Sequence, residues 1–166
     1  YYMGDRGFAG KWSHHEQFQR VPLIVYDPRL SEDLRGRTVD PVALNLDLPA
    51  TFLDWAQVEI PASYQGTSLK PVIENDTPPQ AWRDDFFCEH QNPKYAMSWL
   101  GVRGARFKYA RYTDQEPHYE FLHDLKNDPD ELTNLVDDPE YASVLEQLRQ
   151  RTQTLAEQYA NAPIPD

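Results

Sequence analysis

The stretch MSWLGVRGARFKYARY, residues 97–112, decides the fold of the second half of this chain. In its latter part Phe107, Tyr109 and Arg111 alternate with residues of different character. Side chains two residues apart share one face of a β-strand, so this alternation predicts a strand. Gly104 and Ala105 interrupt the pattern in the middle of the stretch. We therefore predict two strands that are joined at these two small residues.

The flanking segments extend this pair into a sheet. We predict one strand in DDFFCEH (residues 84–90) and another in HYEFLHDL (residues 118–125), which the turn KNDPDE closes. Consecutive strands with short connections are typical of an antiparallel sheet. A last helix is predicted within residues 137–160, with Asp138 as N-cap and Pro139 at the first helical position. Its apolar stripe predicts that it lies on the sheet, and the stripe consists of Tyr141, Val144, Leu145, Leu148, Leu155 and Tyr159.

The first half of the chain has a different pattern of apolar and polar residues. VPLIVYDP (residues 21–28) is a continuous apolar run, typical of a strand buried in the parallel sheet of an α/β fold. A helix is predicted near residues 46–57, and the proline-rich residues 59–81 form a long connection. A buried parallel strand needs neighbours on both edges that these residues do not supply, so we expect more of the fold in front. The predicted domains are the end of an α/β domain (1–75) and a smaller C-terminal subdomain (82–166).

Composition excludes several classes of protein. The net charge of −11 and the pI near 4.8 argue against a general nucleic-acid binder, which needs a positive surface. The single cysteine, Cys88, excludes an internal disulfide framework and a thiolate zinc cluster. No stretch approaches the roughly 20 apolar residues of a membrane span. Residues 1–10 have neither the basic head nor the apolar core of a signal peptide.

Lys11 stands between Gly10 and Trp12, shortly before the apolar run. In open α/β sheets, ligands collect outside the carboxyl ends of the strands. A lysine beside such a crevice can reach an anion as a mobile point charge. The alternative is a solvated surface lysine next to a packed tryptophan, and residue type alone favours that reading.

His14, His15 and Glu16 follow directly after this segment. Adjacent residues on a strand or helix point apart, and the helical spacing H-E-x-x-H is absent, so we expect no metal site here. Glu16 and Arg20 are four residues apart, which predicts an ion pair that orients the loop.

Cys88, Glu89 and His90 lie together at the end of a predicted strand. A nucleophilic cysteine would need a histidine across the site, and the sequence identifies none, so we expect Cys88 to pack as a small apolar residue. Glu89 and His90 are candidates for contact with a polar substrate. The next hairpin carries a concentration of positive charge, on Arg103, Arg106, Lys108 and Arg111. These side chains either guide an anion to the site or form an ordinary solvated strand face.

Three segments together resemble the type I sulfatases. Residues 1–28 are similar to the family pattern G-K-x-x-x-Y/H-E-x-x-x-R-x-P, with matches at Gly10, Lys11, His15, Glu16, Arg20 and Pro22. DLPATFLDWAQVEIPASYQGTSLKPVI (residues 47–73) resembles D-x-x-P-T-x-L-x-x-A-G-x-x-x-P…x-G-x-S-L-x-P. Residues 101–141 resemble the terminal G-V-R-x-x-R-x-K-Y…E-L-Y-D-L-x-x-D-P-x-E-x-x-N-L. The resemblance covers nearly the whole chain in the right order.

This resemblance implies an alkaline-phosphatase-like α/β fold with a smaller subdomain of antiparallel sheet plus C-terminal helix. It implies hydrolysis of sulfate esters by a formylglycine nucleophile with a calcium ion. The formylglycine motif C/S-x-P-x-R is absent, because Cys88 is followed by Glu-His-Gln. The family's metal ligands fall before the position of Tyr1. We therefore expect the C-terminal portion of a sulfatase, without metal ligands in this segment and inactive without its N-terminal part.

By the same resemblance, Lys11 is the catalytic residue that donates to the sulfate. The expected substrate-binding residues are Lys11, His15, Glu89, His90 and Arg103, whereas Glu16 and Arg20 hold the lysine's loop. Arg6 stands where many members carry His, so contacts with the substrate are expected to differ if Arg6 faces the pocket.

Two alternatives stay open beside the sulfatase. One is a phosphonate or phosphodiester hydrolase of the same superfamily, and the other is a non-catalytic binding module. A sulfated sugar is the preferred substrate, because the basic hairpin and Glu89-His90 are suited to a polar anionic ring, and an aryl sulfate remains the alternative. The resemblance to the sulfatase family implies that the protein is located in the periplasm, in the lysosome or outside the cell.

Overall fold

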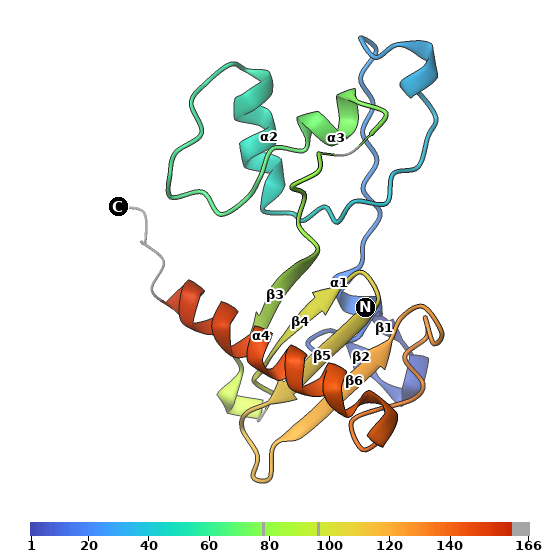
Figure 1. Cartoon of the computed structure of the whole chain (residues 1–166), viewed down its shortest axis with the longest axis vertical. Coiled ribbons are helices and arrows are strands. Elements are labelled where there is room, and N and C mark those ends of the chain that lie inside the picture. Colours follow the sequence, from blue (N-terminus) through green and yellow to red (C-terminus); the bar gives the residue numbers. More distant parts are fainter. Residues whose placement is uncertain (78, 96, 161–166) are drawn as a thin grey trace. The chain divides into compact units, whose positions relative to one another are not determined.

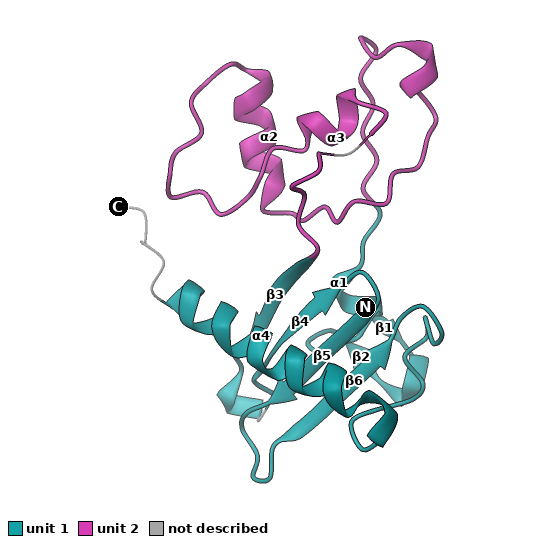
Figure 2. Cartoon of the chain, viewed as in Figure 1, with its two compact units in different colours: residues 1–22, 85–162 teal, residues 23–84, 163–166 magenta. Residues whose placement is uncertain are grey.

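The computed structural model describes residues 1–77, 79–95 and 97–160. The chain forms two compact units, which Figure 2 distinguishes by colour. Unit 1 combines residues 1–22 with the chain from Asp85 to the end of the last helix, and unit 2 comprises residues 23–84. The predicted division kept residues 1–75 together, whereas in the structure residues 1–22 pack with the C-terminal part. Residues 161–166, which end the predicted C-terminal subdomain, lie outside the described residues.

A four-stranded antiparallel sheet forms the centre of unit 1 (Figure 1). Its strands are β3 (Asp85–His90), β4 (Trp99–Gly104), β5 (Phe107–Tyr112) and β6 (Tyr119–Asp124), in that spatial order. Val102 of β4 lies opposite Tyr109 of β5, and Tyr109 lies opposite Leu122 of β6. All four strands were predicted from the sequence, and their antiparallel arrangement was predicted from the short connections between them; the structure confirms both.

The C-terminal helix α4 (Ala142–Ala160) packs across this sheet (Figure 1). It follows a single 3₁₀ turn, η4 (Pro139–Tyr141), which starts at the predicted cap: Asp138 Oδ1 accepts a hydrogen bond of 2.9 Å from the amide of Glu140. The predicted stripe supplies the buried residues Leu145 and Leu155. These residues complete a core with Val102, Tyr109 and Leu122, as the amphipathic pattern requires.

The N-terminal segment of unit 1 consists of short elements. Strands β1 (Tyr2–Met3) and β2 (Ala9–Gly10) pair antiparallel around the 3₁₀ turn η1 (Asp5–Gly7). The single-turn helix α1 (Glu16–Gln19) follows, and the turn η3 (Pro93–Tyr95) lies later in the chain, between β3 and β4. The segment contacts the sheet directly: the carbonyl of Trp12 accepts a hydrogen bond from Trp99 of β4, and Glu16 pairs with Lys108 of β5.

Unit 2 contains helix α2 (Asp47–Trp55), helix α3 (Lys70–Glu74) and the turn η2 (Glu32–Leu34). The helix predicted near residues 46–57 is therefore confirmed. Its first residue, Asp47, is fully buried and accepts hydrogen bonds from the amides of Leu44 and Thr67. Arg83 pairs with the same carboxylate at 2.7 Å, so the charge of the buried Asp47 is compensated.

The strand predicted at residues 21–26 does not form, and that prediction is wrong for this chain. The segment is irregular, with 89% of Ile24 and 87% of Tyr26 exposed. The physical reason is the absence of a hydrogen-bonding neighbour among the described residues, because a parallel strand cannot satisfy its amide groups alone.

Candidate functional site

A pocket of about 350 Å³ lies in unit 1. Its walls are mainly aromatic and include Tyr2, Phe8 and Phe121. Two predicted site residues, Lys11 and His15, also line it. The structure therefore brings the predicted catalytic residue Lys11 and the predicted substrate-binding residue His15 to the same pocket.

The backbone around Lys11 has an unusual conformation. Gly10 has a φ of 90° and Trp12 a φ of 126°, in the region that L-residues rarely adopt. The carbonyl of Trp12 is fixed by the indole N–H of Trp99, which donates to it at 2.7 Å. The Lys11 side chain itself is exposed, with Nζ 5.4 Å from the centre of the Tyr1 ring. Sheet strand β4 thus anchors the backbone that presents this cation.

An aromatic stack lies next to Lys11. The Trp12 ring stacks on His90, with centroids 6.2 Å apart, and on Tyr95, with centroids 5.9 Å apart. This places the candidate His90 beside the lysine segment. Glu89 is exposed and, as the neighbouring residue of strand β3, points to the opposite face of the sheet. Glu89 and His90 therefore cannot both face one substrate from this strand.

Glu16 belongs to a buried ion-pair network. Its carboxylate lies 2.7 Å from Nζ of Lys108 and 3.2 Å from the guanidinium of Arg103. Lys108, only 2% exposed, also pairs with Glu131 at 2.8 Å, and the amide of Glu16 donates to Glu131 Oε2 at 2.7 Å. Burial acts to raise the pKa of Glu16, but Lys108 and Arg103 outweigh it and hold that pKa below its ordinary value.

The predicted ion pair between Glu16 and Arg20 is wrong. Helix α1 ends at Gln19, and Arg20 has an extended backbone, so the four-residue helical spacing does not bring the two side chains together. Arg20 is exposed and has no ion pair to any residue that the structure describes. Glu16 instead pairs with Arg103 of strand β4 and Lys108 of strand β5.

The cations of the hairpin are largely neutralised. Arg103 pairs with Glu16, Lys108 pairs with two carboxylates, and Arg106 pairs with Asp124 at 2.6 Å. These three side chains do not form a free positive face. The sequence showed their alternation but not their carboxylate partners, which come from other elements.

Arg6 does not line the pocket beside Lys11. Its guanidinium donates to the backbone carbonyl of Glu131 at 2.8 Å. The residue instead ties the turn η1 to the segment that follows strand β6.

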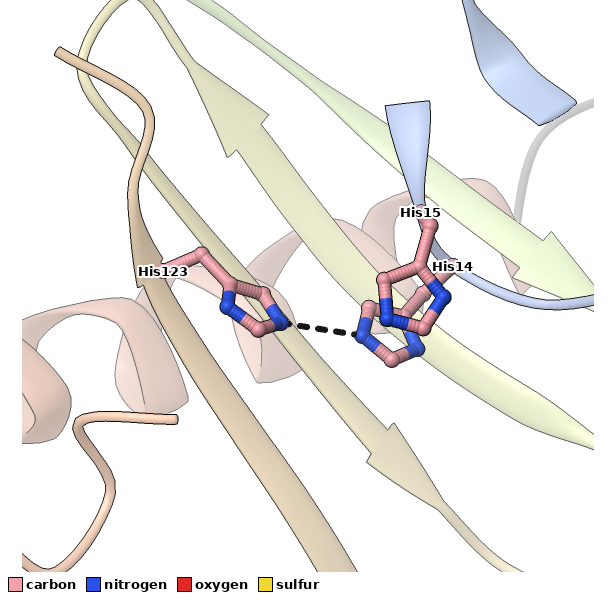
Figure 3. A group of neighbouring side chains, drawn as sticks. All are labelled: His14, His15 and His123. Atoms are coloured by element: carbon pink, nitrogen blue, oxygen red, sulfur yellow. Dashed lines mark hydrogen bonds between the residues drawn. The ribbon is translucent and has the colours of Figure 1, made fainter. Parts of the chain in front are cut away.

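Three histidines converge beside the pocket (Figure 3). Nε2 of His14 lies 3.1 Å from Nε2 of His123, and one nitrogen of each ring, His15 included, lies within 4.8 Å of the other two. His14 and His123 are almost fully buried. His123 was not predicted as a site residue from the sequence. It could have been noticed because it precedes Asp124 and Leu125, at a position where the family pattern Y-D-L has a tyrosine.

The described residues do not suit calcium or formylglycine. Calcium takes oxygen ligands, whereas the group of metal-ligating side chains found among the described residues consists of imidazoles. Burial raises the pKa of the Cys88 thiol to about 12, which leaves little thiolate at neutral pH. Cys88 is half-buried in strand β3, and a raised pKa is expected of a thiol that packs as a small apolar residue.

Residues 4–158 match the family described as "N-sulphoglucosamine sulphohydrolase, C-terminal". An N-acetylglucosamine-6-O-sulfatase of Bacteroides thetaiotaomicron is 32% identical over 96% of this chain and 29% of the relative. A solved structure of a protein in complex with its substrate D-glucosamine-2-N,6-O-disulfate superposes with a TM-score of 0.86, at 31% identity, over 96% of this chain and 33% of the other. The phosphonate monoester hydrolase of Agrobacterium radiobacter gives a TM-score of 0.62 at 27% identity, over 75% and 27% of the two chains.

The chain thus spans about a third of the length of these relatives. None of the helices in the described parts of the chain is both long and apolar enough to cross a membrane.

Proposed function

Since this chain belongs to the C-terminal family of the sulfatases, we propose that it completes the active site of an enzyme that hydrolyses sulfate esters. The observation that carries the proposal is the position of Lys11, which lines a pocket together with His15 in a chain that the family matches over residues 4–158. The nucleophile and the calcium ligands would come from the part of the protein outside this chain.

Lys11 would act on the sulfuryl group. A fixed ammonium stabilises the negative charge that develops on the sulfuryl oxygens and on the departing oxygen. The anchored carbonyl of Trp12 fixes the backbone from which the Lys11 side chain extends toward the pocket. A cation held in place before the reaction stabilises a transition state better than one that must be ordered.

The other candidates take more limited roles. His15 would contact the substrate as a neutral polar group, since burial lowers its pKa to about 3. Arg103 would act by holding Glu16, because its guanidinium is engaged there at 3.2 Å. His90 would flank Lys11 through its stack with Trp12, and Glu89 lies on the other face of the strand.

A sulfated amino sugar is the proposed substrate class. The support is that one relative is an N-acetylglucosamine-6-O-sulfatase and that the superposed structure contains a disulfated glucosamine as its substrate. The aromatic walls of the pocket suit the apolar face of a sugar ring. Arg103, Arg106 and Lys108 are engaged with carboxylates, so these three cations of the hairpin do not support binding of the sugar.

A phosphonate monoester hydrolase is the second candidate, because a structure with that activity superposes on three quarters of the chain. We would assay the intact protein on glucosamine 6-sulfate, an aryl sulfate and a phosphonate monoester. Lys11→Ala should lower kcat/KM for the sulfate ester by roughly 10²–10³-fold. The control Lys126→Ala changes an exposed lysine elsewhere in unit 1 and should leave it unchanged. Preference for the phosphonate, or full activity of Lys11→Ala, would contradict the proposal.

A further inference from the structure

We propose that His14, His15 and His123 form a binding site for a divalent transition metal, with Zn²⁺ as the expected ion. This inference does not rest on the sulfatase activity, although it shares His15 with the proposed substrate contacts. It concerns nitrogen ligands, which calcium does not take.

The spacing of the ligand atoms supports the site. Two nitrogens that each lie 2.0–2.1 Å from a tetrahedral zinc are about 3.3 Å apart. The Nε2 atoms of His14 and His123 are 3.1 Å apart, close to that spacing without any rearrangement. The ligand nitrogen of His15 lies within 4.8 Å of those of His14 and His123, so it must move closer by at most about 1.5 Å to reach this spacing. His15 is only half-buried and borders the pocket, which gives its ring room to turn.

Each ring is held through its other nitrogen. Nδ1 of His123 lies 3.0 Å from the carbonyl of Thr133, and Nδ1 of His14 lies 3.1 Å from the hydroxyl of Tyr112. Nδ1 of His15 lies 2.8 Å from Oγ of Ser13. Metal-binding histidines usually have such a partner, which fixes the ring and leaves Nε2 for the metal. Figure 3 shows a nitrogen of His15 turned to the side on which His14 meets His123.

The two facing Nε2 atoms have only one proton between them in their neutral forms. A carbonyl only accepts, so His123 carries its proton on Nδ1 and presents a lone pair at Nε2. His14 then donates from Nε2 to His123. A metal ion would replace the proton between the two Nε2 atoms. His14 would then carry its proton on Nδ1 and donate it in a hydrogen bond to the hydroxyl of Tyr112.

The electrostatics are compatible with a dication. An imidazole is mostly neutral at neutral pH, so each ring can offer a lone pair to a metal ion. The nearby ammonium of Lys108 is balanced by Glu16 and Glu131. Three neutral imidazoles favour zinc, copper, nickel or cobalt. A fourth coordination position toward the pocket would remain for water or a small anion.

The test is direct metal binding, with activity playing no part in the readout. The intact protein is stripped with a chelator and titrated with Co²⁺, a visible substitute for Zn²⁺, while its ligand-field absorption is recorded. We expect one equivalent to bind with the intense bands of a tetrahedral nitrogen site, and Zn²⁺ to displace it. His123→Gln and His15→Gln should each weaken binding at least tenfold, whereas His118→Gln, the same change at a histidine outside the cluster, should not.

Circular dichroism of each variant separates lost binding from lost folding. If the buried variant His123→Gln does not fold, the half-buried His15→Gln decides the question. A folded wild type that binds no Co²⁺, or binding that survives both cluster variants, would overturn the proposal. Loss of sulfatase activity with intact cobalt binding would bear only on the proposed function.

Discussion

The ammonium of Lys108 lies 2.7 Å from a carboxylate oxygen of Glu16, and the lysine is 2% exposed. This pair joins the centre of the sheet to the segment that carries Lys11 and His15. Glu131 closes the network from the far side through its own contact with Lys108. The site segment therefore depends on strand β5 for its position.

Lys108→Met should destabilise the protein by about 3–5 kcal/mol, because it leaves the buried carboxylate of Glu131 without its partner. Chemical denaturation monitored by tryptophan fluorescence measures the change. Lys126→Met, at an exposed position, is the control and should be nearly neutral. An equal effect of the two substitutions would show that the buried network contributes nothing to stability.

Glu16 should make stability depend on acid pH. Its folded pKa is lower than the ordinary value of 4.5, so its contribution is complete above that value. The contribution is lost as the pH falls through the lower folded pKa, where both states become protonated. Glu16→Gln should flatten this part of the curve of unfolding free energy against pH. The exposed carboxylate variant Glu59→Gln should keep the wild-type shape, and identical curves for both variants would refute the prediction.

Trp99→Phe should lower activity on a sulfate ester about tenfold, because the carbonyl of Trp12 loses its donor and Lys11 is less well placed. Stability should fall by about 0.5–1.5 kcal/mol for the lost hydrogen bond. Trp55→Phe removes a comparable bond, to Glu74, in unit 2 and serves as the matched control. We expect Trp55→Phe to affect stability without this loss of activity, and a similar loss in both would contradict the anchoring role.

Cys88 should react slowly with thiol reagents in the folded protein. Its pKa of about 12 means that the thiolate is scarce until the pH is far above neutral. The rate of modification by a disulfide reagent should rise by orders of magnitude on unfolding. Cys88→Ala should keep full activity on a sulfate ester, and inactivation by this change would make the thiol a functional group after all.

Leu122→Ala should lower the free energy of unfolding by about 2–5 kcal/mol, since Leu122 of strand β6 is fully buried in the core that also contains Leu145 and Leu155 of α4. Leu132→Ala, at a residue that is 75% exposed, should lower the free energy of unfolding far less. Thermal unfolding of both variants checks the comparison.

We predict that this chain of 166 residues does not hydrolyse sulfate esters on its own. Turnover of a chromogenic aryl sulfate by this chain alone, absent from its Lys11→Ala variant, would show the prediction to be wrong.

The sequence by itself determined the local structure of unit 1. The period of two in residues 107–111 and the apolar stripe of α4 require only neighbouring residues, so they predicted strand and helix correctly. Asp138 and Pro139 likewise marked the start of the helix, because capping is a local interaction. The family motifs identified Lys11 and Glu16 as candidate site residues, because the spacing of a motif is a property of the sequence alone.

Tertiary structure alone decided which distant groups meet. The register of β5 and β6 sets Lys108 opposite His123, and this brings a lysine and a histidine of separate strands beside His14. The same reason explains the failure at residues 21–26, where an apolar pattern became an exposed segment. A strand needs a hydrogen-bonding partner, and a buried charge needs a counterion. Both partners can lie anywhere in the chain, so no local pattern can reveal them.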